Sequence, residues 1–370
     1  MLKYNDMKMM HNLFIVLPIV YLLGNAYVYW RLWPLMSSLP MWGKVAFSIL
    51  FWVMSLLFVA VIMMRNVAMP QWLAKVMYVG GSSWLVVVLY LVLAFGITDV
   101  IRLFIPSASH GYLWALCATL LLLGYGYFNY RIPKVERIEM SLNKPLKGGS
   151  LKAVAVSDIH LGLGTGKSTL KRYVELINEQ HPDVVLIAGD LIDNNITPVV
   201  ENHMEEELNA INAPMGVYLV PGNHEYISGI EDCEAFLAKT NIKLLKDSIV
   251  ELPCGVQIIG RDDRFNLRRK PVGHIVEEVD ATKPIIMVDH QPYEVAKKDS
   301  LGVDIQLSGH THHGQVWPLS MLVDRMYEQS HGSKKWKNSH VYVSSGLSLW
   351  GPPFRIGTRS DMAVITIKGK

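Results

Sequence analysis

The sequence has few cysteines and, over its first third, few charges. Three cysteines in 370 residues are too few for a disulfide scaffold, and 28 glycines and 18 prolines are too few for a collagen-like or low-complexity chain. The formal net charge of +3 is too small and too evenly spread to indicate a nucleic-acid-binding protein. Only 7 of the 35 Lys and Arg and 2 of the 32 Asp and Glu lie within residues 1–130. The first third is therefore strongly apolar, whereas the remainder has an ordinary soluble composition.

Four apolar stretches in the first third each have the length of roughly 20 residues that crosses a bilayer. They cover residues 12–30, 45–64, 72–97 and 112–130. No ionisable side chain lies near the middle of any stretch, and tryptophan and tyrosine gather near the ends, as in an interfacial aromatic belt. A buried bundle in a soluble protein is the alternative, but the short loops marked by Lys and Arg favour the membrane. We predict a transmembrane domain of four helices over residues 1–132.

The distribution of Lys and Arg around these stretches predicts their orientation. Three basic residues lie on one side, and nine lie on the side of both termini: Lys3, Lys8, Arg65, Lys75, Arg131, Lys134, Arg137, Lys144 and Lys147. Because basic residues concentrate in cytoplasmic loops, we expect both termini and the remaining domain in the cytoplasm, at the inner membrane if the protein is bacterial. The lack of ionisable groups at mid-membrane favours an anchor over a transporter or channel.

Residues 133–370 alternate short apolar runs with helix-like segments, which predicts an α/β domain with a partly parallel sheet. Helical patterns occupy residues 168–180, 201–212 and 230–240. The predicted strands cover residues 151–157, 184–188, 217–220, 256–259, 284–288, 305–307, 341–344 and 362–367.

Side chains of the types that bind metals follow five of these strands, directly where each strand ends. They are Asp158 and His160, Asp190 and Asp193, Asn223 and His224, His290, and His310 and His312. In an open α/β sheet, ligands bind in the crevice outside the carboxyl ends of the strands. One histidine after a strand is usually a structural cap, but five such placements together predict a common site.

This constellation resembles the calcineurin-like metallophosphoesterases. The family pattern of Asp-x-His, Gly-Asp-x-x-Asp, Gly-Asn-His-Glu/Asp, a lone His and Gly-His-x-His occurs here in order within residues 151–315. The resemblance implies a β-sandwich of two mixed sheets flanked by helices over residues 133–370. The N-terminal stretches, together with the late Val-Ser-Ser-Gly at residues 343–346, are similar to the membrane-anchored branch, which includes bacterial lipid-precursor phosphoesterases. His313 departs from that branch, where Gly is common; it is either a substrate contact or a bystander.

The same resemblance implies two divalent metal ions as the cofactor. One ion is assigned to Asp158, His160, Asp190 and His312. Asp190 then bridges to a second ion, which is assigned to Asn223, His290 and His310. Mixed carboxylate, amide and imidazole ligands suit Mn, Fe or Zn better than Mg, and Mn is our first expectation.

The expected chemistry is hydrolysis at phosphorus. Two metal ions polarise a phosphoryl oxygen and lower the pKa of a shared water, so that hydroxide attacks in line. His224 resembles the family's general acid, which protonates the leaving oxygen, and Asp193 orients it.

The sequence therefore predicts a membrane-anchored phosphoesterase acting on a phosphodiester or pyrophosphate of a membrane lipid or lipid precursor, with a UDP-diacylglucosamine-type pyrophosphate as one candidate. The apolar segment 347–354 is suited to acyl chains, and anionic headgroups are expected at a basic run formed by Arg261, Arg264, Arg268, Arg269 and Lys270.

Three other functions are weighed against this prediction. A catalytically silent membrane receptor is the main alternative, but such proteins usually lose a ligand or the acid, and here the full set is present. A phosphoprotein phosphatase would carry arginines where Asn194 and Tyr226 stand. No extended basic and aromatic stripe indicates a nuclease or a nucleic-acid partner.

Overall fold

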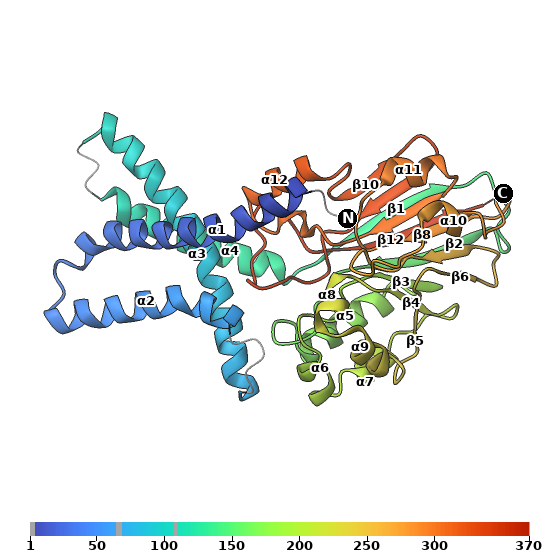
Figure 1. Cartoon of the computed structure of the whole chain (residues 1–370), viewed down its shortest axis with the longest axis horizontal. Helices are drawn as coiled ribbons and strands as arrows, with labels where there is room; N and C mark the ends of the chain where they lie inside the picture. Colours follow the sequence, from blue (N-terminus) through green and yellow to red (C-terminus); the bar gives the residue numbers. More distant parts are fainter. Residues whose placement is uncertain (1–3, 64–68, 107–109, 370) are drawn as a thin grey trace. The chain divides into compact units, whose positions relative to one another are not determined.

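The computed structural model describes the backbone of residues 4–63, 69–106 and 110–369, and within these ranges the side chains from Val16 onward, apart from residues 61 and 62. By its packing the chain divides into two compact units, Met1–Gly126 and Tyr127–Lys370 (Figure 1). The predicted domain boundary, between residues 132 and 133, lies six residues further along the chain than this division.

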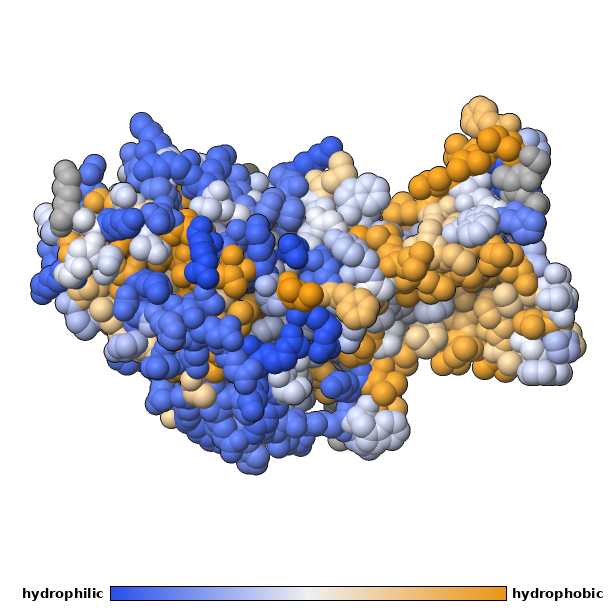
Figure 2. Space-filling view, turned by 180° about the vertical axis from the view of Figure 1, so that it is seen from behind, coloured by the Kyte–Doolittle hydropathy of each residue, from blue (hydrophilic) through white to orange (hydrophobic). Residues whose placement is uncertain are grey.

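The first unit is built from long helices. They are α1 (Tyr4–Leu32), the short 3₁₀ helix η1 (Trp33–Met36), α2 (Met41–Met63), α3 (Gln71–Phe104) and α4 (Gly111–Tyr130), whose last turn belongs to the second unit. Helices satisfy every backbone polar group within one segment, which suits apolar sequences that leave water. Apolar residues cover most of the visible surface of this unit (Figure 2).

Small and aromatic residues determine how these helices pack. A Cβ on Gly81 of α3 would lie 3.0 Å from the backbone of Phe58 in α2, so glycine permits the close approach of these two helices. Phe51, Phe95 and Val28 form part of a buried apolar cluster to which α1, α2, α3 and α4 all contribute. Asn25 of α1 is also buried, and it accepts a hydrogen bond of 2.9 Å from Nε1 of Trp84.

Helix α3 is longer than the predicted stretch 72–97 and therefore includes an ionisable residue near its end. Asp99 pairs with Arg31 of α1 at 2.7 Å and accepts hydrogen bonds from the hydroxyls of Tyr27 and Tyr112. Asp99 and Arg31 neutralise each other here, which lowers the cost of keeping both charges among apolar helices.

The prediction of four spanning helices is wrong in number. Among the described residues, three helices are long and apolar enough to cross a membrane: Met41–Ala60, Gln71–Phe104 and Gly111–Tyr130. The first predicted span, residues 12–30, falls in α1, where the side chains of residues 4–15 lie outside the described set. Its remaining described part, from Val16 to Leu32, is too short to count as a span and contains Pro18, Asn25 and Arg31. Residue 64, where the second predicted span ends, also lies outside the described residues.

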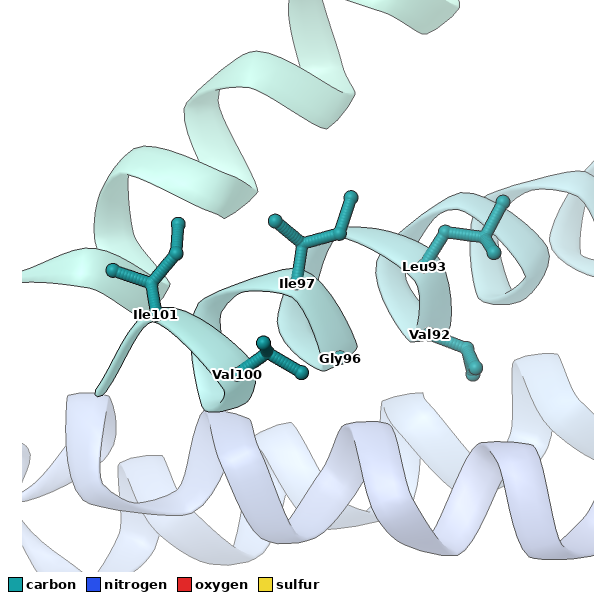
Figure 3. A pocket seen from close by; sticks show the side chains of 6 residues that line it. All are labelled: Val92, Leu93, Gly96, Ile97, Val100 and Ile101. Atoms are coloured by element: carbon teal, nitrogen blue, oxygen red, sulfur yellow. The ribbon is translucent and has the colours of Figure 1, made fainter. Parts of the chain in front are cut away.

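One face of α3 carries a shallow apolar depression of about 400 Å³ (Figure 3). Its lining is Val92, Leu93, Gly96, Ile97, Val100 and Ile101, none of which carries a polar side chain. The depression therefore lacks groups for chemistry, and its lining suits apolar chains such as those of lipids.

The second unit contains two six-stranded mixed sheets. The first has the order β1-β12-β2-β3-β4-β5, in which only β12 and β2 pair antiparallel. The second has the order β10-β11-β9-β8-β7-β6, with antiparallel pairs at both edges and parallel pairs between them. The strands are β1 (Lys134–Ser141), β2 (Ser150–Val156), β3 (Val184–Ala188), β4 (Val217–Val220), β5 (Ile242–Leu244), β6 (Ser248–Glu251), β7 (Gln257–Gly260), β8 (Ile285–Val288), β9 (Ile305–Ser308), β10 (Gly332–Lys335), β11 (His340–Val343) and β12 (Asp361–Lys368).

Successive side chains of a strand point to opposite faces of its sheet, so apolar residues are buried on both faces. Ala153 and Ala155 of β2 join a buried cluster with Ile258 and Leu307 of the second sheet, so this cluster fills the space between the sheets. Val154, one position along, joins the cluster on the opposite face, which the helices cover. The predicted α/β domain with two mixed sheets flanked by helices is confirmed.

The helices of this unit are short. They are α5 (Lys167–Asn178), α6 (Thr197–Glu201), α7 (Glu205–Asn209), α8 (Asn223–Ser228), α9 (Ile230–Leu237), α10 (Val272–Val276), α11 (Val295–Ser300), α12 (Leu319–Met326) and the 3₁₀ turn η2 (His312–Gly314). The predicted helix 201–212 is instead two short pieces, α6 and α7, since residues 202–204 form turns.

Candidate metal centre

The predicted site residues gather at the carboxyl ends of parallel strands from both sheets. β2, β3 and β4 are neighbours in the first sheet, and β8 and β9 are neighbours in the second. Among the predicted site residues, three groups hold ligand-type atoms within 4.8 Å of one another: Asp158, His160 and His312; His160, Asp190 and His224; and Asp190, His290 and His310.

The first group has the spacing of ligands around one ion. Nε2 of His160 lies 3.0 Å from Nε2 of His312, and the latter lies 3.4 Å from Oδ1 of Asp158. Two ligand atoms at right angles around an ion, each about 2.1 Å from it, are about 3.0 Å apart. All three side chains lie deep in the protein, where facing ring nitrogens need a proton or a cation between them.

The group of Asp190, His290 and His310, which Asn223 adjoins, has a similar spacing. Nε2 of His290 lies 3.2 Å from Oδ2 of Asp190 and 3.1 Å from Oδ1 of Asn223. The other ring nitrogen, Nδ1 of His290, lies 2.7 Å from the carbonyl oxygen of Ala188, to which it donates when Nε2 is free to bind a metal. The His310 ring is 5.1 Å from that of His290. These residues fit a second divalent ion, and their roles as ligands stay predictions.

Asp190 belongs to two of these groups, with His160 and His224 in one and with His290 and His310 in the other. Its Oδ2 lies 3.8 Å from Nε2 of His160 on one side and 3.2 Å from Nε2 of His290 on the other. Its Oδ1 accepts a hydrogen bond of 2.9 Å from the backbone N–H of His224, which fixes the orientation of the carboxylate. A carboxylate in this position can serve two cations, as the predicted bridge requires.

The backbone at these residues is unusual. Asp158, His160, Asp190, His310 and His312 all have positive φ, between 46° and 72°. Residues other than glycine rarely adopt this left-handed conformation, and it persists at functional sites where the surroundings enforce it. The consequence is that each strand end turns sharply and directs its side chain to the common centre.

Glycines beside the ligands permit close approach. A Cβ on Gly189, which has φ of +84°, would lie 2.5 Å from Nδ1 of His290. A Cβ on Gly222 would overlap the carboxylate of Asp190, and one on Gly309 would overlap that of Asp158. These motif glycines are needed because no side chain fits between the two sheets at the metal centre.

Asp193 and His224, predicted as the catalytic pair, are in contact. Oδ1 of Asp193 lies 3.1 Å from Nδ1 of His224 and 3.5 Å from Nδ1 of His160. Burial alone would raise the pKa of Asp193, but its contacts with His160 and His224 hold that pKa below the usual value. Burial alone would lower the pKa of His224, but Asp193 and the charge of Asp190 raise it. His224 therefore holds its proton more firmly than a free imidazole, as a general acid needs.

Glu225 is a supporting residue to which the sequence analysis gave no role. It is fully buried, and its carboxylate accepts hydrogen bonds from the backbone N–H groups of Asp190, Ile192 and Gly222. Burial, reinforced by the charge of Asp190, raises the pKa of Glu225 to about 7. The glutamate joins the turn after β3 to the turn after β4, and its place in the Gly-Asn-His-Glu run was the available signal.

A buried ion-pair network lies next to His290. Asp289 contacts Lys298 at 2.7 Å and Arg269 at 2.6 Å, and all three side chains are largely buried. Asp289 directly precedes His290 in sequence and is not in a candidate ligand group. Asp289 thus neutralises two buried cations directly beside a candidate ligand.

The predicted basic run does not act as one surface. Arg261 is buried and pairs with Asp247 at 2.7 Å, and Arg269 is held by Asp289, so these two cations are unavailable to a headgroup. Arg264 is exposed and lies over the ring of Tyr293, at 4.6 Å from its centroid. The ring of Tyr293 is 5.2 Å from that of Tyr327, which in turn is 6.3 Å from His310.

The predicted acyl-chain segment, residues 347–354, is partly core. Leu347 and Leu349 are buried, whereas Trp350 is half-exposed, with its ring 6.2 Å from that of His224. Arg355, just after the segment, is fully buried and donates to the carbonyl oxygens of His312 and Ser348. Trp350 therefore forms an apolar wall beside the candidate acid.

His313 and His331 lie beside the site. His313 stacks on His331 with ring centroids 3.5 Å apart, and its Nε2 lies 3.2 Å from Oδ1 of Asp324. His331 is exposed and approaches the same carboxylate at 3.7 Å, so His313, Asp324 and His331 form a further group of ligand-type atoms close together. The role of His313 toward a substrate stays a prediction.

Comparisons with known proteins agree with this geometry. The profile of the family described as calcineurin-like phosphoesterase matches residues 151–314. A Helicobacter pylori protein named "Uncharacterized metallophosphoesterase" is 33% identical over 281 residues, covering 74% of this chain and 72% of that protein. The Danio rerio "Transmembrane protein with metallophosphoesterase domain" is 33% identical over 274 residues, covering 69% of this chain and 62% of that protein. A solved dimetal phosphatase from Danio rerio aligns with a TM-score of 0.37 and 12% identity, over 53% of this chain and 87% of that one.

Two sheets that converge on clustered aspartates and histidines define a metallophosphoesterase domain. The chain belongs to the calcineurin-like phosphoesterase family, whose members in general hydrolyse phosphoesters with two bound metal ions. The combination of apolar helices with this domain is shared with relatives named as transmembrane proteins, which indicates membrane association.

Proposed function

We propose that this protein is a membrane-anchored, two-metal phosphoesterase that hydrolyses a phosphodiester or pyrophosphate bond of a membrane lipid or lipid precursor. The observation that carries the proposal is the position of Asp190, which is shared by two ligand groups and is hydrogen-bonded to the backbone of His224. The candidate metal ligands thus lie next to His224, whose imidazole is paired with Asp193 and can donate a proton.

The residues of this chain have separate tasks in the proposed reaction. Asp158, His160, Asp190 and His312 would hold one ion, and Asp190, Asn223, His290 and His310 the other; Mn²⁺ is our first choice, with Fe or Zn as alternatives. When bound, the ions supply Lewis acidity toward a phosphoryl oxygen and toward the attacking water.

His224 then donates a proton to the leaving oxygen. Asp193 holds the imidazole in place and stabilises its protonated form, since it contacts Nδ1 and leaves Nε2 free to donate. Because Asp193 contacts both His224 and His160, it holds the candidate acid next to a candidate metal ligand.

An amphiphilic substrate is favoured by what surrounds the centre. Trp350 offers an apolar surface beside His224, and Arg264 offers an exposed cation that successive contacts through Tyr293 and Tyr327 connect to His310. A lipid with a phosphorylated headgroup has an acyl chain that suits the apolar surface and an anion that suits the cation. The described part of the chain also contains three helices able to span a bilayer, which is a larger anchor than a soluble substrate requires.

The test compares a lipid pyrophosphate with its water-soluble headgroup analogue, using the full chain with Mn²⁺ in mixed micelles and bis-p-nitrophenyl phosphate as the reference substrate. We expect a higher kcat/KM for the lipid and a selective loss of that preference in Trp350→Ala. Val200→Ala is the control, because Val200 is 38% exposed on α6 and lies outside the candidate ligand groups. A preference for the soluble analogue would overturn the lipid proposal, and hydrolysis of neither reference nor lipid would overturn the activity.

A further inference from the structure

Helix α12 (Leu319–Met326) exposes apolar residues on one face and contacts the protein through Ser320 and Asp324 on the other. Leu319, Met321, Leu322 and Met326 are between 44% and 60% exposed, whereas Ser320 is buried. Leu319, Leu322 and Met326 lie on one face by their helical spacing, and Ser320 and Asp324 lie on the opposite one. Surface helices of soluble domains show the reverse arrangement, and an exposed apolar patch of this kind marks an interaction surface.

The polar face fixes α12 to the loop that contains candidate metal ligands. Asp324 pairs with His313 at 3.2 Å, and Ser330 donates a hydrogen bond to the same carboxylate. A Cβ on Gly314 would lie 2.6 Å from the backbone of Leu319, so the start of the helix packs tightly on η2. These contacts fix the orientation of α12 and leave Leu319, Leu322 and Met326 outward.

The same region of the second unit holds the end of the last candidate span. Nδ2 of Asn129, in the final turn of α4, donates hydrogen bonds of 2.9 Å to the carbonyl oxygens of Arg355 and Thr358. Between these two residues, Ile356 accepts a hydrogen bond of 2.7 Å from the backbone N–H of Trp317. Trp317 is itself 48% exposed and lies two residues before the first residue of α12. A span that ends at Tyr130 ends at the membrane–water boundary, so residues held against its last turn lie near that boundary.

Charge around this patch matches a lipid surface. Arg131, Arg325 and Arg359 are exposed, whereas the carboxylate of Asp324 is taken up by His313 and Ser330. Glu328 is exposed, and its carboxylate accepts a hydrogen bond from the backbone N–H of Ala296. Arginines beside an apolar helix face complement the phosphates of anionic lipids, and Trp is common at the interface.

We propose that Trp317 and α12 form a bilayer-docking surface, with Leu319, Leu322 and Met326 inserted among the acyl chains and the flanking arginines at the headgroups. Docking would hold the loop of His310 and His312 at the membrane surface. The inference concerns the membrane and goes beyond the proposed hydrolysis, so its test uses no enzymatic activity.

The test measures the surroundings of a spin label at position 322 in the full chain, reconstituted in vesicles of phosphatidylethanolamine and phosphatidylglycerol. Cys117 is exposed and is replaced by serine, whereas Cys233 and Cys254 are buried and remain. Leu322→Cys receives the label, and Lys243→Cys is the control. Lys243 is exposed on β5, at the sheet edge opposite β1, the strand that follows α4.

We expect the label at position 322 to collide with oxygen several-fold more than with an aqueous nickel chelate, relative to the label at position 243. Equal nickel accessibility at the two positions would show a water-exposed helix and overturn the proposal. Low accessibility to both reagents would also overturn it. In that case, spin–spin broadening that disappears on dilution with unlabelled protein identifies a second copy as the occupant, and unbroadened spectra identify contact within the chain.

Discussion

Oδ1 of Asp193 lies 3.1 Å from Nδ1 of His224, so the carboxylate supports the ring nitrogen that faces away from a leaving group. The same oxygen is 3.5 Å from Nδ1 of His160, a candidate metal ligand. One buried carboxylate thus positions both the candidate acid and a ligand. This relationship leads to the first two predictions.

Replacement of His224 by alanine should slow poor leaving groups most. A p-nitrophenolate leaves without a proton, whereas an alkoxide needs one, so kcat for an alkyl phosphodiester should fall further than kcat for bis-p-nitrophenyl phosphate. Metal content, measured by mass spectrometry of the purified protein, should stay at the wild-type value. Equal losses for the two substrates would exclude the general-acid role.

Asp193→Asn should shift the pH dependence of hydrolysis. His224 must be protonated to act, so activity falls as pH rises through its pKa, and Asp193 raises that pKa. Without the carboxylate the pKa drops, and the fall in kcat/KM for an alkyl ester should begin at lower pH than in the wild type. A p-nitrophenyl ester serves as the control, since its rate depends little on the acid. An unchanged profile for the alkyl ester would contradict the pairing.

Asp190→Asn should impair both metal ions at once. The loss of turnover should be at least several hundredfold, beyond the roughly 10–100-fold typical of residues that only support a ligand. Glu225→Gln provides that comparison, because Glu225 contacts the backbone of Asp190 and is not itself in a ligand group. The measurement combines metal content with turnover, and two bound metals with normal turnover in Asp190→Asn would refute the bridge.

Asp289→Ala should destabilise the catalytic unit by about 3–5 kcal/mol, because it leaves two buried cations without a partner. Glu251→Ala, which removes a surface pair with Lys283, should cost less than about 1 kcal/mol. Burial would raise the pKa of Asp289, but Lys298 and Arg269 lower it to about 2. Its ionised form therefore stabilises the fold above about pH 4, and this contribution is lost as pH falls toward 2. Calorimetric unfolding of the full chain in detergent measures both effects; equal losses in the two variants would contradict the prediction.

A reporter fused after Lys370 should indicate a cytoplasmic C-terminus. The excess of Lys and Arg on the side of both termini is the physical reason, because basic residues are retained on the cytoplasmic side. Fluorescence of a cytoplasm-dependent reporter, compared with the activity of periplasmic alkaline phosphatase at the same position, provides the readout. Phosphatase activity would reverse the assigned orientation.

Local patterns predicted much of the catalytic unit. The strands that carry the ligands are short buried runs, and each was recognised because β-sheet burial leaves apolar sequences such as Val184–Ala188 bounded by polar residues. Their polar ends were predicted to meet because parallel strands share one edge. The contacts between His160 and His312, far apart in sequence, follow from the pairing of two sheets and were available only through the family resemblance.

Other features depend on tertiary packing and carried no local signal. The positive φ of Asp158 and Asp190 is enforced by surrounding hydrogen bonds, and no residue pattern marks it. Arg261 and Arg269 look like surface cations in sequence, yet distant aspartates bury them. The outward apolar face of α12 was missed because Leu319–Met326 has the periodicity of an ordinary core-facing helix.

Each predicted metal sphere takes ligands from both sheets, with Asp158 and Asp190 after strands of the first and His312 and His290 after strands of the second. An ion bound at either position is therefore a cross-link between the sheets, and its binding free energy adds to that of folding. At a free ion concentration 100 times Kd, one site adds about 2.7 kcal/mol to the free energy of unfolding. Cellular metal supply would thus govern how long the catalytic unit survives proteolysis as well as how fast it turns over.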